Sequence, residues 1–181
     1  MRKLTASLFM SLDGVVDSPQ QWNPPYMNEE TMGVMAGTMQ ATDALLLGRV
    51  TYEEWAGYWP DQPSDGGMAD FINGTPKFVV SETLKSVEWE NATVLDGDVS
   101  EAVGQLKAGP GRGIMVNGSG TLVRSLLAKG LVDELALLVH PIVVGHGKHL
   151  FEAGEEPCGL ELAASETFRT GVLNLTYRPA Q

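Results

Sequence analysis

Cysteine is nearly absent from this sequence, and positively charged residues are scarce. Cys158 is the single cysteine among 181 residues, so no internal disulfide can form. Only 12 lysines and arginines stand against 23 aspartates and glutamates, which gives a net charge of −11. A chain without a basic stripe cannot neutralise a phosphate backbone or an anionic membrane surface. We therefore expect no nucleic-acid partner and no membrane partner.

Long apolar runs are missing as well. No stretch approaches the length that spans a membrane, and residues 1–6 lead directly into a strand-like alternation without the apolar core and cleavage site of a signal peptide. The apolar fraction of 43% and the charged fraction of 19% are ordinary for a soluble globular protein. With no internal repeat or linker, the sequence predicts one cytoplasmic domain over residues 1–181.

Short apolar runs alternate with helical patterns along the chain. Strands are expected at residues 3–11, 44–47, 78–81, 94–95, 114–116 and 132–139, with a final antiparallel pair at 160–164 and 172–177. Helices are expected after the N-cap Asn28 and at residues 51–58, 99–107 and 121–129. Because strands that alternate with helices build parallel sheets, the pattern predicts an α/β fold. We expect a three-layer α/β/α sandwich with a mostly parallel central sheet and an antiparallel C-terminal edge.

Two strand-to-helix junctions share one composition, namely an apolar run, a glycine, a small hydroxyl residue and a helical pattern. The first junction contains Gly48, Arg49 and Thr51, and the second contributes Gly118, Ser119, Gly120, Thr121 and Leu122. Such a turn exposes backbone N–H groups at the positive end of a helix dipole, which suits a phosphate. Two junctions in one small domain predict a ligand with two separated phosphate groups, such as NADPH.

Each junction also has a plainer interpretation. The Arg49 guanidinium can form two parallel hydrogen bonds with a phosphate, or it can pair with Glu53 one helical turn away. The glycines on either side of Ser119 can serve a phosphate, or they can form only a tight turn and a helix cap. We favour the phosphate at both places, since two junctions support one another.

Asp13 is a candidate catalytic residue with two open interpretations. It follows the first expected strand, and in open α/β sheets that edge lines the ligand crevice. The same residue can form an Asx-type turn before Gly14, and the sequence does not decide between the two.

Aromatic side chains gather in two segments and could form a wall for a flat heterocycle. Trp22 lies in a proline-rich loop, where we expect it to act as a lid over a substrate, and Tyr52 follows the first junction. The alternative is packing in the core or at a dimer interface, which we favour for Trp55. The methionines at 32, 35 and 39 are expected in the core or in one wall of a substrate cleft.

The histidines do not form a pattern of metal ligands. His146 and His149 are surrounded by glycines rather than placed on a helix, and no thiol or nearby acid completes a site. We therefore expect no metal.

Taken in order, several motifs resemble one family. They are Ser11-Leu12-Asp13-Gly14, the stretch 48–53, Val80-Ser81, the stretch 118–122, Leu131 to Leu135, His140-Pro141 and Val144-Gly145. The set is similar to the dihydrofolate reductase-like family, and more narrowly to stand-alone relatives of the C-terminal reductase domain of the bacterial bifunctional riboflavin-biosynthesis deaminase–reductase. The resemblance covers nearly the whole chain.

The resemblance implies a mostly parallel sheet flanked by helices, a homodimer and NADPH as the cofactor. It implies that Gly48, Arg49 and Thr51 line the adenosine and phosphate side of the cofactor. By the same resemblance Ser81 lies near the adenosine 2′-phosphate, and the stretch from Gly118 to Leu122 holds the pyrophosphate.

The resemblance also implies reduction of a small pyrimidine- or pteridine-like substrate, as in 5-amino-6-(5-phosphoribosylamino)uracil reductase. Weak dihydrofolate reductase activity and a non-catalytic NADP-binding dimer are the alternatives. The riboflavin-pathway reductase carries a substrate-binding glutamate where this chain has Asn117. Dihydrofolate reductases carry a carboxylate on the first helix, where Glu29 and Glu30 are the nearby acids. Asp13, either glutamate or an ordered water can supply the proton.

Overall fold

A computed structural model describes residues 1–154 and 156–180 of the chain. The strands in this part are β1 (Lys3–Ser11), β2 (Ala44–Gly48), β3 (Lys77–Val80), β4 (Ala92–Leu95), β5 (Gly113–Val116), β6 (Glu134–His140), β7 (Leu160–Thr167) and β8 (Leu173–Pro179). The α-helices are α1 (Glu29–Ala41), α2 (Arg49–Ala56), α3 (Met68–Gly74), α4 (Val99–Ala108) and α5 (Gly120–Ala128). Short 3₁₀ turns lie at Pro19–Gln21, Pro24–Tyr26 and Trp59–Asp61.

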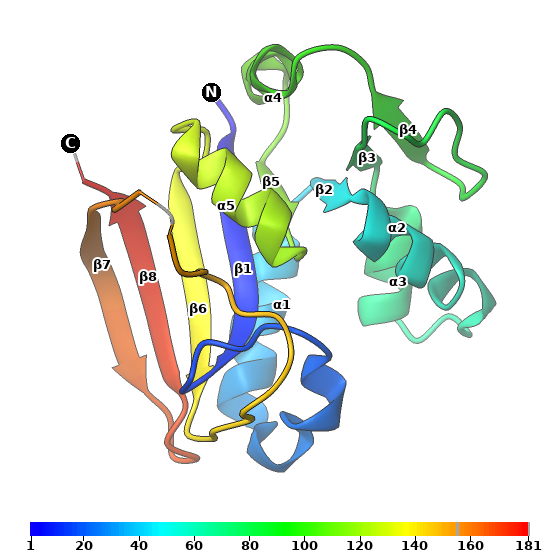
Figure 1. The fold of residues 1–181 in the computed structure, drawn as a ribbon. Helices are drawn as coiled ribbons and strands as arrows, with labels where there is room; N and C mark the ends of the chain where they lie inside the picture. The colour runs from blue at the N-terminus through cyan, green and yellow to red at the C-terminus, as the bar shows by residue number, and fades with distance from the viewer. Residues whose placement is uncertain (155, 181) are drawn as a thin grey trace.

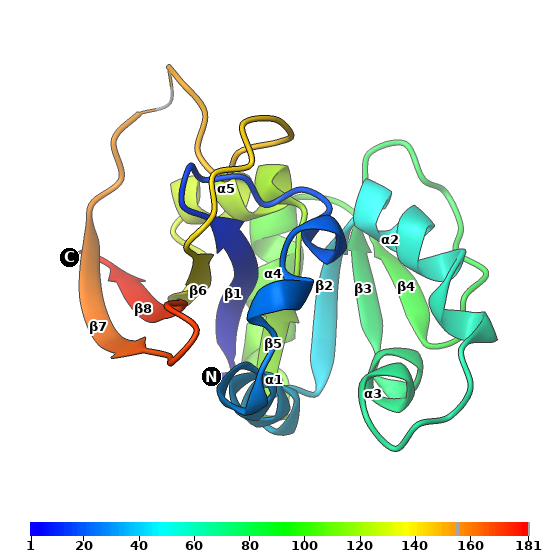
Figure 2. The same cartoon turned by 90° about the horizontal axis from the view of Figure 1, so that it is seen from below.

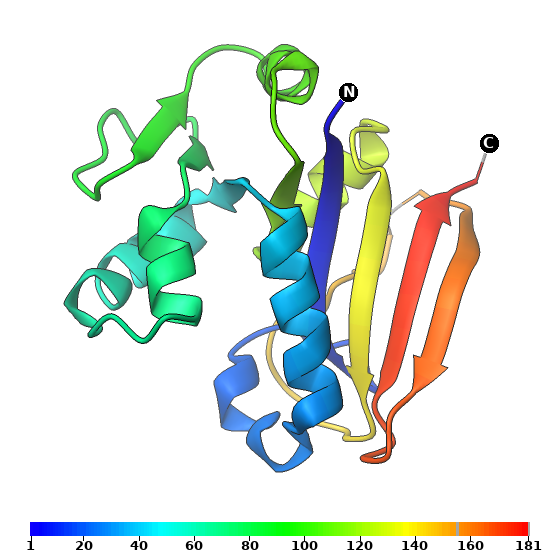
Figure 3. The ribbon, with the colours of Figure 1, turned by 180° about the vertical axis from the view of Figure 1, so that it is seen from behind.

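The described strands form one eight-stranded sheet in the order β4-β3-β2-β5-β1-β6-β8-β7. The pairings from β4 to β6 are parallel, whereas β6–β8 and β8–β7 are antiparallel. Helices α4 and α5 cover one face, and α1 and α3 cover the other (Figures 1 and 3). The expected α/β sandwich with an antiparallel C-terminal edge is therefore confirmed.

The middle of the sheet is apolar on both faces, as expected for strands that helices cover from both sides. All five residues of β2 are buried. On one face Leu4 and Leu46 pack against Leu126 of α5, and on the other face Leu45 packs with Ile72 of α3. Residues in such a core are held by the burial of apolar surface, at about 25 cal/mol per Å².

Helix α1 is packed less tightly than α5. Its start follows from the sequence, because the side chain of Asn28 accepts a hydrogen bond from the Thr31 backbone N–H at 3.0 Å. Within the described residues 29–41, Thr31 is the only buried residue, and a Cβ added at Gly33 or Gly37 would meet nothing within 4 Å. Both glycines are exposed, so this side of the helix faces solvent.

Some boundaries differ from the expected ones. Helix α2 begins at Arg49 rather than at residue 51, and β6 begins at Glu134 rather than at 132. The Asp133 carboxylate accepts a hydrogen bond from the Leu4 backbone at 2.7 Å, which ties the chain before β6 to β1. Helix α3 was not expected, since its seven residues are too few for a periodic pattern and buried Ile72 anchors it by tertiary packing.

The β7–β8 hairpin forms one end of the sheet, and β7 is exposed along nearly its whole length (Figure 2). None of the described helices is long and apolar enough to cross a membrane.

Candidate functional site

The two glycine junctions meet at one edge of the sheet. Strands β2 and β5 pair in parallel, with Leu46 opposite Val116, so the chain leaves both strands at their carboxyl ends. A Cβ built on Gly48 would lie 3.3 Å from Ser119 Oγ, and one built on Gly118 would lie 3.6 Å from Thr51 Oγ1. The structure therefore brings the two junctions into direct contact, as open α/β sheets do at a ligand crevice.

Both junctions open a helix. Ser119 caps α5, because its Oγ accepts a hydrogen bond from the Leu122 backbone N–H at 3.4 Å. Gly48 is the N-cap of α2 and has no side chain to cap it, so the first N–H groups of α2 lack a side-chain acceptor. Gly118 has a φ of 81°, which favours glycine, and its peptide bond to Ser119 is cis.

Arg49 and Ser81 lie at the same edge but already have partners. Arg49 Nη1 lies 2.7 Å from Glu53 Oε2, which is the ion pair that the plainer interpretation predicted. Because both side chains are half exposed, this pair contributes little stability and a phosphate can displace the glutamate. The hydroxyl of Ser81, just after β3, accepts hydrogen bonds from the backbone N–H groups of Thr83 and Leu84 at 3.2 and 2.9 Å.

These features fit a phosphorylated dinucleotide. Two helix N-termini lie close together, the glycines before them permit this close approach, and the half-exposed Arg49 guanidinium stands at the start of α2. Backbone N–H groups in this arrangement bind phosphate oxygens without any buried cation.

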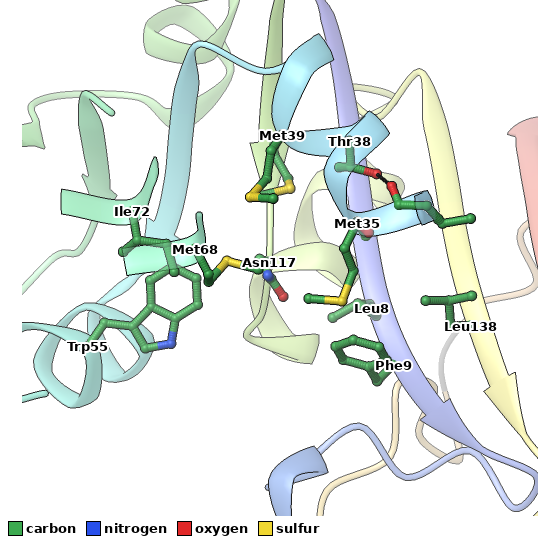
Figure 4. A pocket seen from close by; sticks show the side chains of 13 residues that line it. Leu8, Phe9, Met35, Thr38, Met39, Trp55, Met68, Ile72, Asn117 and Leu138 are labelled. Atoms are coloured by element: carbon green, nitrogen blue, oxygen red, sulfur yellow. Dashed lines mark hydrogen bonds between the residues drawn. The ribbon is translucent and has the colours of Figure 1, made fainter. Parts of the chain in front are cut away.

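A mostly apolar cavity adjoins the junctions. Its walls come from α1, with Val34, Met35, Thr38 and Met39, and from α2 and α3, with Trp55, Met68 and Ile72 (Figure 4). Its floor comes from the strands, with Ser7, Leu8, Phe9, Met115 and Leu138, and from Asn117 after β5. The enclosed space measures about 40 Å³, and the cavity opens to solvent at its mouth, where a larger ligand would extend.

Asn117 connects the cavity with the junctions. It directly precedes Gly118, and Figure 4 shows its amide between Met68 and Met35, pointing into the cavity. Asn117 therefore lies in the cavity wall, and its expected contact with a substrate stays a prediction.

Trp55 also lines the cavity, although we favoured packing for it on the sequence alone. The three-residue spacing from Tyr52 places the two rings on nearby positions of α2, but only the docking of the helix shows which one turns to the cavity. Met35 and Met39, four residues apart on α1, line the cleft as one of the two expectations had it.

Trp22 and Tyr52 lie elsewhere, contrary to their expected roles in substrate binding. The Tyr52 hydroxyl accepts hydrogen bonds from the Glu88 and Trp89 backbones at 3.1 and 3.3 Å, and its ring is buried. Trp22 is buried as well, with Nε1 donating to Asp17 O at 3.0 Å and its ring edge against His140. Because their polar atoms are satisfied inside the protein, both side chains act in packing.

Tyr52 borders a second hollow, with Trp89, Glu88 and Glu90. The two glutamates precede β4 and lie at the opposite edge of the sheet from the junctions. Acidic groups do not suit a phosphate, so this hollow is not part of the candidate site.

Asp13 connects two loops through hydrogen bonds. Its carboxylate accepts hydrogen bonds from Ser11 Oγ at 2.6 Å, from Val144 N at 3.1 Å and from Gly145 N at 2.8 Å. The bonds from Ser11, Val144 and Gly145 hold the pKa of Asp13 well below its usual range. A carboxylate that remains ionised is a poor proton donor, and the turn interpretation of Asp13 gains support.

Glu30 has a similar structural position. It accepts hydrogen bonds from the Arg169 backbone at 3.0 Å and from Asn28 Nδ2 at 2.7 Å, which joins the start of α1 to the β7–β8 turn. The Arg169 backbone bond is the main cause of its lowered pKa. Neither Glu30 nor Asp13 lines the cavity.

The histidines of the described chain lie in separate surroundings. Within the described residues, no group of three or more His, Cys, Asp or Glu side chains could hold a metal ion. His146 Nδ1 lies 2.9 Å from the Val144 carbonyl, and His149 forms an isolated bridge with Val15.

Comparison with known proteins agrees with this fold. The family model of the RibD C-terminal domain matches residues 2–174. Two proteins of Bacillus subtilis (strain 168) are similar along their length: "Uncharacterized protein YyaP" is 27% identical over 97% of this chain and 94% of its own. "Uncharacterized protein YwjB" is 26% identical over 94% of this chain and 95% of its own.

Two solved structures share the fold. A "Putative riboflavin biosynthesis protein" from Shewanella sp. PV-4 superposes with a TM-score of 0.74 at 22% identity, covering 100% of both chains. A "pyrimidine reductase-like protein" from Corynebacterium diphtheriae superposes with a TM-score of 0.70 at 15% identity, covering 99% of this chain and 92% of its own.

The hydrogen bonds to the Asp13 carboxylate predict that the free energy of unfolding falls at low pH. A carboxyl group whose pKa is lowered by folding stabilises the fold above its unfolded pKa of about 4, and this contribution falls as the pH drops further. We expect Asp13→Asn to lower the free energy of unfolding at pH 7 and to differ less from the wild type at pH 3. Urea unfolding at both pH values measures this. Asp61→Asn, at an exposed position, is the control, and a constant deficit for Asp13→Asn would contradict this prediction.

Proposed function

The chain belongs to the RibD C-terminal domain family, and we propose that it is an NADPH-dependent reductase of a small pyrimidine- or pteridine-like molecule. The main support for this proposal is that the apolar cavity adjoins the turn between the two helix N-termini. Asn117 lines an apolar cavity, and the next residue, Gly118, begins the turn at which two helix N-termini meet. Phosphates at the turn and flat rings in the cavity can therefore belong to one reacting pair.

The residues at the junctions would hold the phosphate groups. The N–H groups that open α5, from Gly120 onward, face the pyrophosphate in this proposal, and those that open α2 face the adenosine side. Arg49 would exchange Glu53 for the 2′-phosphate, and Ser81 lies at the same edge after the neighbouring strand β3. The preference for NADPH over NADH rests on these two residues.

When bound, the cofactor supplies a hydride to a carbon of a substrate C=N bond and is itself oxidised, while a proton from water completes the new N–H group. The cavity walls would hold the substrate ring in one orientation toward the cofactor.

The proton is expected to come from water. Among the described residues that line the cavity, none has an ionisable carboxyl, imidazole or amine group. The same observation favours a second candidate function, a protein that binds NADP without catalysis. Tight dinucleotide binding without turnover of any pyrimidine or pteridine would support that candidate.

We also propose that the protein forms a homodimer through one face of the β7–β8 hairpin. The pairing places Leu162 opposite Tyr177 and Thr167 opposite Leu173 on this face, while Glu161 and Glu166 belong to the other. Leu162 is 55% exposed and Leu173 is 37% exposed. An uncharged apolar face lets two chains of net charge −11 approach without opposed carboxylates.

The role of Arg49 is tested by its replacement. We expect Arg49→Ala to weaken NADPH binding about tenfold, since a charge-assisted hydrogen bond to a phosphate contributes about 1.5–3 kcal/mol. NADH, which lacks the 2′-phosphate, should lose far less. Calorimetric titration with both dinucleotides measures the difference, and Arg112→Ala, before β5 at the opposite edge of the sheet, is the control. An equal loss for both dinucleotides would remove the argument from Arg49.

The dimer is tested by the molar mass in solution. Sedimentation equilibrium should give about twice 19.4 kDa for the wild type and 19.4 kDa for Leu162→Glu, because the new carboxylate opposes its own copy across the two-fold axis. Leu12→Glu, at a leucine that is 65% exposed outside this face, should remain dimeric. A monomeric wild type, or a dimeric Leu162→Glu variant, would show that this face is not the interface.

A further inference from the structure

The cavity contains no charge. Among the described residues that line it, every side chain is apolar except for those of Ser7, Thr38 and Asn117. A phosphate or carboxylate that entered this space would lose its hydration without gaining a cation, which is costly. The lining therefore selects against anionic groups.

The cations of neighbouring segments are engaged elsewhere. Arg169, which contacts the start of α1, lies 3.6 Å from Glu30, and Arg178 shares Glu134 with Lys3. Arg49 belongs to the junctions and not to the cavity lining. The overall charge of −11 repels an anion further.

The walls suit a flat ring. Trp55 presents its indole from one side, and Met35 and Met39 present their thioethers from α1 (Figure 4). Sulfur atoms and aromatic rings make favourable contacts with a planar π-system, and methionine adapts its shape to the occupant.

Asn117 offers the specific contact. Its amide provides both donors and an acceptor, and no hydrogen bond to another residue of the described chain occupies it. Thr38, in contrast, already donates its hydroxyl proton to the Val34 carbonyl at 2.9 Å. A lactam edge, with C=O beside N–H, matches the asparagine amide through two hydrogen bonds.

From these observations we propose that the substrate is an uncharged planar ring with a lactam edge, without phosphate or carboxylate, which pairs with Asn117 between Trp55 and the α1 methionines. This inference rests on the proposed reductase function and narrows its substrate class. A phosphoribosyl group finds no partner inside the cavity, so an unphosphorylated pterin- or uracil-type ring is the class that fits.

A matched pair of probes tests the charge requirement. 6-Methylpterin and pterin-6-carboxylate share one ring and differ in a single substituent, which is uncharged in the first and anionic in the second. We expect the wild type at pH 7 to bind 6-methylpterin at least tenfold more tightly, as measured by calorimetry with and without saturating NADP⁺. Equal or tighter binding of the carboxylate would overturn the proposal, and so would no binding of either probe.

Variants test the contacts. Asn117→Ala should weaken 6-methylpterin about tenfold, whereas Asn174→Ala, the same change at a half-buried position on β8, should leave it unchanged. Met68→Lys, which adds a cation to the wall, should shift the preference toward pterin-6-carboxylate. Thermal melting checks that each variant is folded. Unchanged affinity in folded Asn117→Ala, or an unchanged preference in folded Met68→Lys, would contradict the assigned contacts.

Failure of this substrate proposal can be distinguished from failure of the proposed reductase function. Titration of the same wild-type sample with NADPH reports on the junctions alone. A protein that binds NADPH but neither pterin retains the reductase assignment and loses this substrate class. A protein that binds no dinucleotide loses the reductase assignment, and its pterin affinities still decide whether the cavity selects uncharged rings.

Discussion

The close approach of two strand-to-helix junctions organises this molecule. Gly48 and Ser119 are near enough that a side chain at position 48 would begin 3.3 Å from the serine hydroxyl. Parallel pairing of β2 with β5 imposes this contact, because both strands end at the same edge. The α2 and α5 N-termini consequently lie close together, and the proposed phosphate binding would depend on backbone geometry rather than on net charge. Under the proposed function, a protein with a charge of −11 would bind an anionic cofactor in this way.

A second feature is the unequal packing of the two faces of the sheet. Helix α5 buries Leu122, Val123, Leu126 and Leu127 against one face. Helix α1 buries only Thr31 among the described residues 29–41 and carries two glycines. The cavity lies between α1 and the sheet, and Asn117 in its wall directly precedes the junction at Gly118. The proposed substrate space therefore lies on the α1 face of the sheet, beside the edge at which the two junctions meet.

Much of the fold could be predicted from the sequence, since buried strands and glycine junctions leave local patterns. The close approach of Gly48 to Ser119 follows from parallel pairing, and the N-cap at Asn28 follows from its side chain. The exchange of roles between Tyr52 and Trp55 could not be predicted, because it depends on how α2 docks. Asp13 could not be assigned either, since its partners Val144 and Gly145 are far away in the sequence.

The central claim is that both junctions form one dinucleotide site, and backbone amide chemical-shift mapping during an NADPH titration tests it most directly. The account predicts saturable shifts at Gly48, Arg49 and Thr51 and at residues 118–122, with little change at Arg112 and Gly113 on the opposite edge of the sheet. Shifts confined to one junction, shifts centred on the hollow beside Trp89, or no shifts at all would contradict it.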